Sequence, residues 1–256
     1  TGATITAQPA TMSVVAKDKT YDGNQDATVK NVVFGGLVGT ENLRYDGALT
    51  GVFASKDAAD GVLGVTFSGY DLNSVSGDGE ARPSNYAITF VPGASAKITP
   101  KAATVSFAAN DKEYDANAVA TRKSYTFVGL VSGESFTLNE NGVTYAFNDK
   151  TAAAGKTVTA STYGLANVEP VGDAKVSNYS FTFNQTATAK IKKKPISIRY
   201  SAKDKTYDGT AAAERDAFDY SEVLSGDVVS VVESGLTYAF QSKEIASGVT
   251  AEGKDA

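Results

Sequence analysis

The sequence predicts an all-β protein of tandem immunoglobulin-like β-sandwich repeats, about 93 residues each, arranged as an elongated rod. A recurring tripeptide supplies the first observation, because Tyr-Asp-Gly at residues 21–23 returns as Tyr-Asp-Ala at 114–116 and as Tyr-Asp-Gly at 207–209. The second is that short apolar segments alternate with polar residues in a period of two, which is typical of half-buried strands. The third is that turn residues interrupt these segments every 8–14 residues or so, with no helical period between them.

The second repeat illustrates the predicted elements in order. Its first strand is expected near residues 104–109, with Val105, Phe107 and Ala109 facing inward. Next come a polar turn at 111–116, a strand at 125–127, a turn at 129–134, a hairpin turn at 141–142, a strand at 143–147, a break at 153–155, and short strands at 157–159, 179–183 and 188–191. The Asn-Gly pair of the hairpin is expected to form a type I′ turn, because both residues tolerate a positive φ.

Seven short strands in a repeat of this size favour an immunoglobulin-like sandwich over a closed barrel or a β-helix. The inward positions of the first strand are repeated in the other copies, as Met12, Val14 and Ala16 and as Ile198, Tyr200 and Ala202. Substitution among apolar residues at fixed positions is what a packed core requires.

The repeat divides the chain into four segments. Residues 1–7 are interpreted as the closing strand of a preceding repeat, 8–100 as repeat 1, 101–193 as repeat 2, and 194–256 as an incomplete repeat 3 without its last two strands. The chain is therefore expected to be a piece of a longer one. Short junctions with a proline, at Pro100 and Pro195, favour stiff connections, and the unpaired edge of repeat 3 invites a partner strand.

Composition argues against several functions. The 256 residues include no Cys and no His, so disulfides, thiolate metal sites and Ser-His or Cys-His nucleophiles are excluded, and carboxylates are scattered over turns without a facing pair. A net charge of −5 gives no basic face for nucleic acid, and no apolar run is long enough to span a membrane. We expect a non-enzyme that neither binds nucleic acid nor inserts into membranes.

Several motifs recur in the same order. Asp-Lys-Thr-Tyr-Asp-Gly occurs at 18–23 and 204–209, Gly-Leu-Val-Ser-Gly-Glu at 129–134, and Ser-Asn-Tyr followed by Ala-Lys-Ile closes the repeats. This arrangement resembles the YDG-type repeat of large secreted bacterial adhesins of the filamentous-haemagglutinin and two-partner-secretion kind. The resemblance implies an extracellular, cell-surface protein without catalytic activity. Ala116 replaces the glycine of the motif, so the second turn is not expected to require a positive φ there.

The turn that carries the tripeptide is the main candidate site. Its residues are Asp18, Lys19, Tyr21 and Asp22, with copies Asp111, Lys112, Tyr114 and Asp115 and copies Asp204, Lys205, Tyr207 and Asp208. We interpret it as structural: Asp bonds nearby backbone N–H groups and Tyr anchors the loop to the core. The alternative is a calcium site, completed by residues such as Asp71 or Asp78. No other cofactor is expected.

Two further hypotheses concern residues that keep the repeat spacing. Lys19 or Lys112 beside Asn85 or Asn178 would suit an intramolecular isopeptide bond, whereas the simpler alternative has Asn capping a turn and Lys in solvent. Tyr70 and Tyr163 lie near turns, where they would stack on a sugar ligand or pack into the core.

These features predict stalk repeats that position a binding region away from the cell. Their expected partners are neighbouring repeats of the same parent chain. Two alternatives remain at this point: each repeat binds a host glycan or protein weakly and the array supplies avidity, or the repeats self-associate along sheet edges, as in a biofilm.

Overall fold

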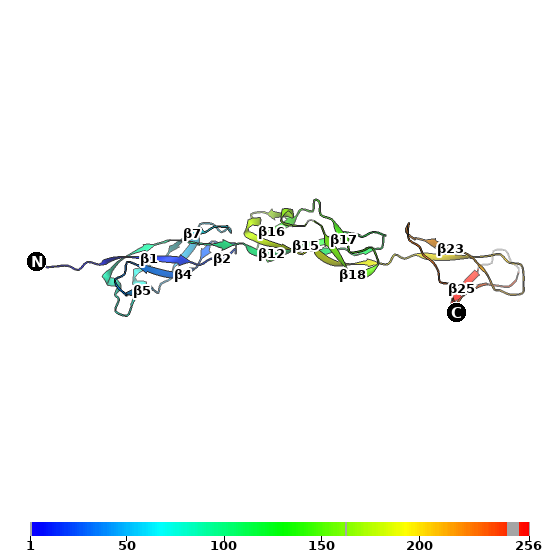
Figure 1. Ribbon diagram of the computed structural model, residues 1–256, viewed down its shortest axis with the longest axis horizontal. Coiled ribbons are helices and arrows are strands. Elements are labelled where there is room, and N and C mark those ends of the chain that lie inside the picture. The colour runs from blue at the N-terminus through cyan, green and yellow to red at the C-terminus, as the bar shows by residue number, and fades with distance from the viewer. Residues whose placement is uncertain (1, 162, 245–250, 256) are drawn as a thin grey trace. The chain divides into compact units, whose positions relative to one another are not determined.

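The computed structural model describes residues 2–161, 163–244 and 251–255 and consists of strands joined by turns (Figure 1). The chain forms two compact units, each described here by itself. The first unit comprises Thr1–Phe107, Ser124–Thr144 and Ala160–Thr186, and the second comprises Ala108–Lys123, Tyr145–Thr159 and Ala187–Ala256. The all-β prediction is confirmed.

The strands of the first repeat are β1 (Gln8–Ala16), β2 (Lys19–Thr20), β3 (Asp26–Ala27), β4 (Val29–Gly35), β5 (Asn42–Tyr45), β6 (Thr50–Phe53), β7 (Leu63–Ser68), β8 (Val75–Asp78), β9 (Tyr86–Val91), β10 (Gly93–Ala96) and β11 (Ile98–Thr99). The second repeat contains β12 (Lys101–Ala109), β13 (Lys112–Glu113), β14 (Val119–Ala120), β15 (Arg122–Val128), β16 (Ser135–Leu138), β17 (Tyr145–Phe147), β18 (Ala153–Ala160), β19 (Val168–Val171), β20 (Tyr179–Phe183) and β21 (Thr186–Lys192). After these come β22 (Ser197–Ala202), β23 (Arg215–Ser221), β24 (Leu236–Phe240) and β25 (Ala251–Asp255). Short 3₁₀ turns are η1 (Leu72–Ser74), η2 (Pro83–Asn85), η3 (Leu165–Asn167) and η4 (Val176–Asn178).

In the first unit, strand β1 is the centre of a three-stranded sheet, antiparallel to β4 and parallel to β9 (Figure 1). A second sheet has the order β10-β7-β6-β3. Residues alternate between buried and exposed along β1 and β7, with Met12 and Val14 on β1 and Phe67 on β7 among the buried side chains. The predicted period of two is therefore confirmed, and it places one apolar face of each sheet in the core.

Strand β12 repeats the arrangement of β1, because it lies between β15 and β20 and is parallel to β20. Val105 and Phe107 are buried on it, as predicted. Beside this sheet an aromatic cluster packs edge to face, and Phe136 lies 5.4 Å from Tyr179 and 5.3 Å from Phe181 between ring centroids. Such pairs contribute about 0.5–1.5 kcal/mol beyond their burial.

The second unit contains a five-stranded sheet in the order β13-β21-β18-β17-β14, followed by the two-stranded pairs β22–β23 and β24–β25. Ile198 of β22 was predicted to face inward, but it is exposed. A two-stranded sheet offers little apolar surface to cover its own face, which accounts for the difference.

Two local predictions in the second repeat are wrong. Residues 141–142 form a turn, but only Gly142 of the pair has a positive φ, and the flanking strands β16 and β17 pair with β19 and with β14 and β18 instead of with each other. The turn therefore carries the chain between sheets, and no type I′ hairpin forms. The predicted break at 153–155 lies inside β18, where Gly155 adopts a φ of 65° without ending the strand.

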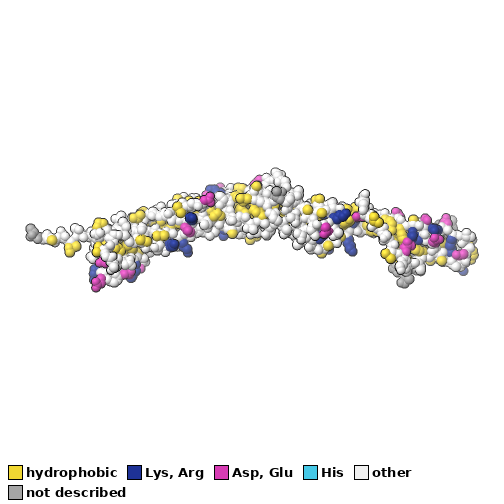
Figure 2. Space-filling model, in the orientation of Figure 1, with side chains coloured by type: hydrophobic (Ala, Val, Ile, Leu, Met, Phe, Trp, Pro, Cys, Tyr) yellow, Lys and Arg dark blue, Asp and Glu magenta, His cyan; other side chains and the backbone are white. Residues whose placement is uncertain are grey.

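Charged side chains of both signs are interspersed over the face of the molecule in Figure 2. No helix in the described part of the chain is long and apolar enough to cross a membrane.

Candidate functional site

Each Tyr-Asp-Gly turn is closed by its lysine. The ammonium of Lys19 donates to Asp22 Oδ1 at 2.7 Å and to the carbonyl oxygen of Asn24 at 2.9 Å. In the next copy Lys112 donates to Asp115 Oδ1 at 2.7 Å and to Asn117 at 3.0 Å. The turn of repeat 3 has the same pattern around Lys205. A donor with three hydrogens can satisfy several acceptors at once, so the lysine fixes the loop conformation.

An aromatic ring covers each of these ammonium groups. Lys19 lies 5.6 Å from the ring centroid of Phe53, Lys112 lies 5.7 Å from that of Phe147, and Lys205 lies 5.9 Å from that of Phe240. These are cation–π distances. The three phenylalanines therefore occupy equivalent places in the three repeats.

The ion pair also lowers the pKa of the turn aspartate. The hydrogen bond from Lys112 lowers the pKa of Asp115, and that from Lys205 lowers the pKa of Asp208 to about 2. The turn carboxylates are consequently charged throughout the physiological range.

The first aspartate of the motif reaches further than predicted. Asp18 Oδ1 accepts from the backbone N–H of Lys97 at 2.7 Å, and Asp111 Oδ1 accepts from that of Lys190 at 2.8 Å. Both partners belong to the closing segment of the same repeat. There β11 runs parallel to β2, with Ile98 beside Lys19. Asp18 therefore ties the last strand of its repeat to the turn.

Tyr21 leaves its own repeat, contrary to the prediction that it anchors the loop to its own core. Within the first compact unit, its hydroxyl donates to Glu134 Oε1 in repeat 2, and its ring packs edge to face on Tyr179 at 5.6 Å between centroids. Only 1% of Tyr21 is exposed. Within the second unit, Tyr114 donates in the same way to Asp227 Oδ1 of repeat 3, at 3.0 Å. Both pairs are separated by 113 residues.

The receiving carboxylate is positioned by its own repeat. Tyr179 donates to Glu134 Oε2, and the hydroxyl of Tyr179 accepts from the N–H of Val131 at 2.9 Å. Burial, followed by the hydrogen bond to Glu134, raises the pKa of Tyr179 to about 12 and raises the pKa of Tyr21 far above its usual value. Both phenols therefore stay protonated and remain donors to Glu134.

A second contact joins repeats 1 and 2 inside the first unit. Asn178 donates to Asp57 Oδ1 at 2.9 Å and accepts from the N–H of Ala58 at 2.9 Å, and Lys175 pairs with Asp57 Oδ2. Asn178 is fully buried, with 0% of its surface exposed. A buried amide with both of its functions satisfied specifies one orientation of the two loops.

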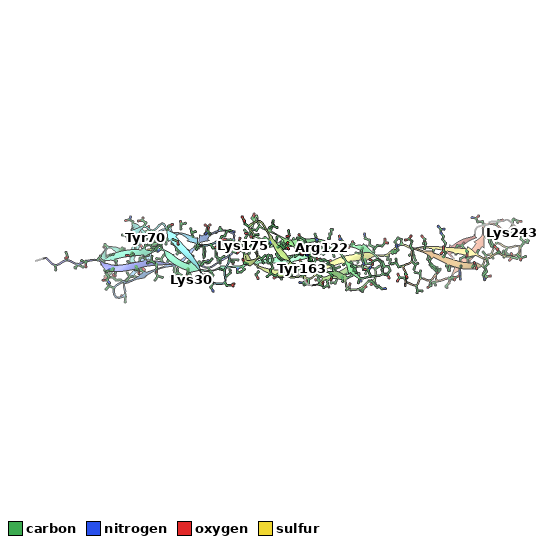
Figure 3. All side chains as sticks on the ribbon, turned by 90° about the horizontal axis from the view of Figure 1, so that it is seen from above. Lys30, Tyr70, Arg122, Tyr163, Lys175 and Lys243 are labelled. Carbon is green, nitrogen blue, oxygen red and sulfur yellow. The ribbon has the colours of Figure 1, made fainter. Side chains whose placement is uncertain are left out.

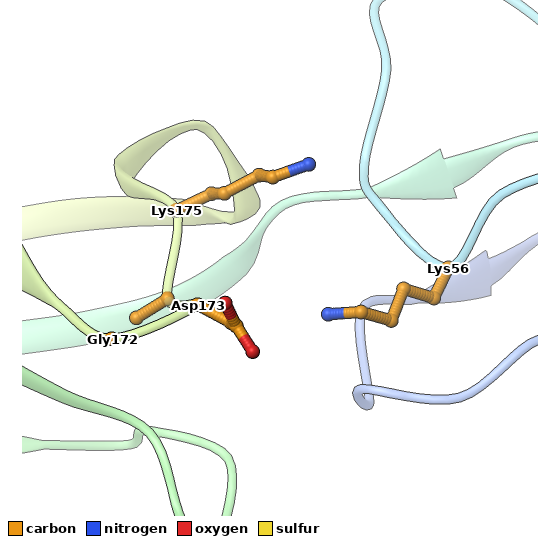
Figure 4. A pocket seen from close by; sticks show the side chains of 5 residues that line it. Lys56, Gly172, Asp173 and Lys175 are labelled. Carbon is orange, nitrogen blue, oxygen red and sulfur yellow. The ribbon is translucent and has the colours of Figure 1, made fainter.

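Beside this contact lies an open hollow of about 410 Å³, lined by Lys56, Gly172, Asp173, Ala174 and Lys175. Lys56 and Asp173 point toward each other across it (Figure 4). Its lining is short and charged, unlike the largely apolar lining of a typical small-molecule site.

Backbone geometry at the third position of the tripeptide explains the preference for glycine. Gly23 has a φ of 85°, and a Cβ there would lie 3.0 Å from Val131 Cγ1 of the next repeat. Ala116 also adopts a positive φ, of 64°. The prediction that this turn does not require a positive φ is therefore wrong: alanine adopts the left-handed conformation at a cost of about 1–2 kcal/mol.

Comparison with protein families found the YDG domain three times in succession, over residues 6–95, 99–189 and 192–255. The chain belongs to the YDG domain family. The comparisons with curated proteins and with solved structures found no match. The tripeptide for which we selected the motif thus coincides with the contact between consecutive YDG repeats.

The residues of the isopeptide hypothesis lie in separate hydrogen-bond networks of the YDG repeats. The amines of Lys19 and Lys112 are held inside their own turns, while the amide of Asn178 bonds to Asp57 and Ala58. The equivalent Asn85 is exposed. No lysine amine of the four is placed against an asparagine amide, so the geometry lends the crosslink no support.

The two tyrosines considered for ligand stacking pack inside their YDG repeats (Figure 3). Tyr70 stacks on Phe90 at 4.9 Å between centroids and on Tyr45 at 6.0 Å. Tyr163 is 5% exposed and meets Phe183 edge to face at 5.3 Å. Burial of the ring faces removes the surface on which a sugar would stack, so the stacking role is contradicted and the core-packing alternative holds.

The residues named for calcium have other partners. Asp78 pairs with Arg44 at 2.9 Å, and Asp71 caps η1 by accepting from the N–H of Asn73 at 3.0 Å. In the described ranges no three acidic side chains gather as a metal site requires.

Sequence reasoning missed the receiving carboxylates, Glu134 and Asp227. A signal existed, because the Gly-Leu-Val-Ser-Gly-Glu segment recurs with an acidic residue in its last place. It was interpreted only as a turn, since a sequence does not indicate which repeat a turn faces.

Proposed function

We propose that these YDG repeats are a non-catalytic structural spacer of a secreted bacterial surface adhesin, which holds a binding region away from the cell. The observation that carries this proposal is the burial of Tyr21, the central residue of the family motif, against the next repeat. A motif residue devoted to joining successive copies is what a spacer needs, whereas a binding motif would face solvent.

The contact favours a stiff connection. Domains joined only by a linker move relative to each other by default. Here Tyr21, Asp57 and Ala58 bond to three side chains of repeat 2, and Pro100 restricts the short link between β11 and β12. Hydrogen bonds to charged groups contribute about 1.5–3 kcal/mol each, so several together outweigh the freedom of so short a link.

The proposal extends to fold and location. We take each repeat to be an immunoglobulin-like sandwich of two sheets, because the strands are short and bury alternate residues. We place the protein outside the cell, on the strength of its family motif, its acidic surface and its lack of Cys.

The test uses the absence of Cys, which permits clean spin labelling of the whole chain. Labels at Thr89→Cys in β9 and Thr182→Cys in β20 occupy equivalent exposed positions of repeats 1 and 2. Double electron–electron resonance should give a narrow distance distribution. Adding Tyr21→Phe and Asn178→Ala should broaden it.

The matched control replaces the equivalent residues that make no such contact, through Tyr207→Phe and Asn85→Ala. This control should leave the distribution narrow. A broad distribution in the unaltered contact, or no difference between the two pairs of variants, would contradict the spacer.

The alternative of multivalent ligand binding has less support, because Tyr70 and Tyr163 are packed among other rings. Binding of the full chain to a glycan array or to host cells would revive it. A chain that is stiff but binds nothing would leave the spacer as the function.

A further inference from the structure

Repeat 1 has the same receiving site that Tyr21 fills on repeat 2, and the site is open. Tyr86 donates to Glu41 Oε2 at 2.5 Å, and the hydroxyl of Tyr86 accepts from the N–H of Val38 at 3.1 Å. These bonds match those of Tyr179, Glu134 and Val131. Among the described residues no hydrogen bond reaches Glu41 Oε1, the counterpart of the oxygen that accepts from Tyr21.

The surroundings of this site are exposed in repeat 1 and covered in repeat 2. Asn85 is exposed, whereas the equivalent Asn178 is buried. Val38 is 56% exposed, whereas the equivalent Val131 lies against Gly23. The receiving surface of repeat 1, comprising Val38, Glu41, Arg82, Asn85 and Tyr86, is therefore preformed and unoccupied.

Repeat 3 has the complementary half of the contact. Lys205 holds the turn through Asp208 at 2.9 Å and through the carbonyl oxygens of Thr210 and Ala212 at 2.9 and 2.8 Å. The turn therefore has the conformation that presents Tyr21 and Tyr114 in the other repeats. Tyr207, however, is 55% exposed.

The first residues of the chain supply a third half-made contact. Ile98 is fully buried where β11 runs beside β2, and Ile191 is buried where β21 runs beside β13. Ile5 occupies the equivalent position and is fully exposed, and residues 2–7 belong to no strand. In repeat 3 the residues equivalent to β2, Lys205 and Thr206, also lie outside any strand.

We propose that two copies of this chain associate head to tail through the contact that joins repeat 1 to repeat 2. Residues 3–6 of one copy add as a parallel strand beside Lys205 and Thr206 of the second copy. Tyr207 of that second copy then donates to Glu41 of the first. The inference rests on the repeat-to-repeat contact of the proposed function and adds a partner for its open halves.

The two contacts are compatible within one interface. Ile98 precedes Glu134 by 36 residues, and Ile5 precedes Glu41 by the same number. The segment that leaves the closing strand is thus as long in the proposed interface as in the existing one. Strand addition to an open edge is a common mode of peptide recognition, because the backbone supplies hydrogen bonds and alternate side chains supply specificity.

Charge at the second contact also fits. Asp57 follows Phe53 by four residues, and its N–H donates to Ser55 Oγ at 3.1 Å. Glu244 follows Phe240 by the same four residues, and its N–H donates to Ser242 Oγ at 3.0 Å. Glu244 therefore takes the place of Asp57 in repeat 3. Opposite it, Arg82 takes the place of Lys175, so the proposed interface pairs an acid with a base again.

Association should be weaker than the contact inside the chain. Within the chain the link at Pro100 gives the two halves a high effective concentration, which separate copies lack. Because the two contacting surfaces differ, the interface does not close on itself and each added copy leaves both halves open. The weight-average mass should therefore rise continuously with concentration.

Disulfide trapping between two singly substituted chains tests the interface directly. Thr99 lies beside Thr20 in the existing contact, so Thr6→Cys on one chain and Thr206→Cys on another should be close enough for a bond. Mild oxidation of the mixture should yield the mixed dimer in clear excess over a mixture of Thr6→Cys with Ser230→Cys, an exposed control in repeat 3. Equal yields in both mixtures would overturn the proposal.

Sedimentation of the full chain tests the side chains. Tyr207→Phe, Glu41→Gln and Ile5→Ser should each lower the association constant about tenfold, while Val228→Ser, which removes an equally exposed apolar side chain, should leave it unchanged. Arg82→Glu should weaken association, and adding Glu244→Arg should restore it.

A monomer at all concentrations, or association that these variants do not alter, would overturn the inference. Either result would leave the spin-label test of the spacer unaffected. A flexible junction between repeats 1 and 2 would contradict the spacer whether or not copies associate.

Discussion

The hydroxyl of Tyr21 donates to the carboxylate of Glu134, which lies 113 residues further along the chain and in the next repeat. Tyr114 and Asp227 repeat this relationship at the same separation. The motif tyrosine is thus a contact between repeats and not an anchor within one. Glu134 accepts from Tyr179 as well, so one carboxylate joins a residue of its own repeat to a residue of the preceding one.

Removing the hydroxyl of Tyr21 should loosen the junction without unfolding either repeat. Tyr21→Phe keeps the ring against Tyr179 but leaves Glu134 with one donor fewer, at an expected cost of about 2 kcal/mol. Hydrogen exchange measured by mass spectrometry should speed up in residues 17–25 and 129–138. The control Tyr207→Phe should have no effect on these segments, and equal exchange in both variants would contradict the contact.

Gly23 and Gly209 separate two reasons for glycine in the motif. Both have a positive φ, but a Cβ at Gly209 meets nothing within 4 Å, whereas one at Gly23 approaches Val131. Gly209→Ala should cost about 1–2 kcal/mol of backbone strain, and Gly23→Ala should cost more. Thermal unfolding measures both. Val131→Ala should recover the steric part in Gly23→Ala, and failure to do so would indicate strain alone.

Ala116→Gly should stabilise the second repeat. Glycine relieves the left-handed strain at this position but gains freedom in the unfolded chain, so the net increase in the free energy of unfolding should be about 0.5–1 kcal/mol. Differential scanning calorimetry should detect a higher midpoint for one transition. A lower midpoint would mean that the strain at Ala116 is smaller than its φ implies.

Asn178 and Asn85 are the same residue of the repeat in two environments. Asn178→Ala would leave Ala58 N–H and Asp57 Oδ1 without their partner in a buried contact, at an expected cost of about 2–3 kcal/mol. Asn85→Ala changes an exposed residue and should cost less than about 0.5 kcal/mol. Urea unfolding of the two variants, compared at equal protein concentration below the onset of association, distinguishes a buried contact from a generic effect of the substitution.

The Asp57 contact should weaken in acid. The hydrogen bonds from Lys175 and then from Asn178 lower the pKa of Asp57 below the ordinary value of 3.8. A carboxyl with a lowered pKa in the folded state contributes stability that is complete above its unfolded pKa and is lost as the pH falls through the folded pKa.

The difference in the free energy of unfolding between the native chain and Asp57→Asn should therefore be constant above about pH 5 and shrink below about pH 4. Urea titrations at several pH values would measure it. A difference that grows in acid would reverse the sign and contradict the pairing.

Much of the fold could be predicted from local pattern. The inward positions Met12, Val14, Val105 and Phe107 follow from a period of two that β-strands impose wherever one face is buried. Ile198 follows the same pattern and is exposed, because alternation does not say whether a second layer covers the strand.

The candidate site was predictable only in part. The recurring Asp, Lys, Tyr and Asp identified the turn, and the lysine–aspartate pair spans three residues, which local geometry favours. The burial of Tyr163 was not predictable, since its rings of contact come from strands that are distant in the sequence.

By itself the sequence determined the all-β class, the three YDG repeats and the residues of their turns, because periodicity and spacing are properties of the chain. Only the tertiary structure decided that Tyr21 faces Glu134, that Asn178 is buried while Asn85 is exposed, and that Ala116 has a positive φ. The physical reason is that identical residues acquire different energies from what is packed against them. That neighbour is brought by the fold from more than 100 residues away.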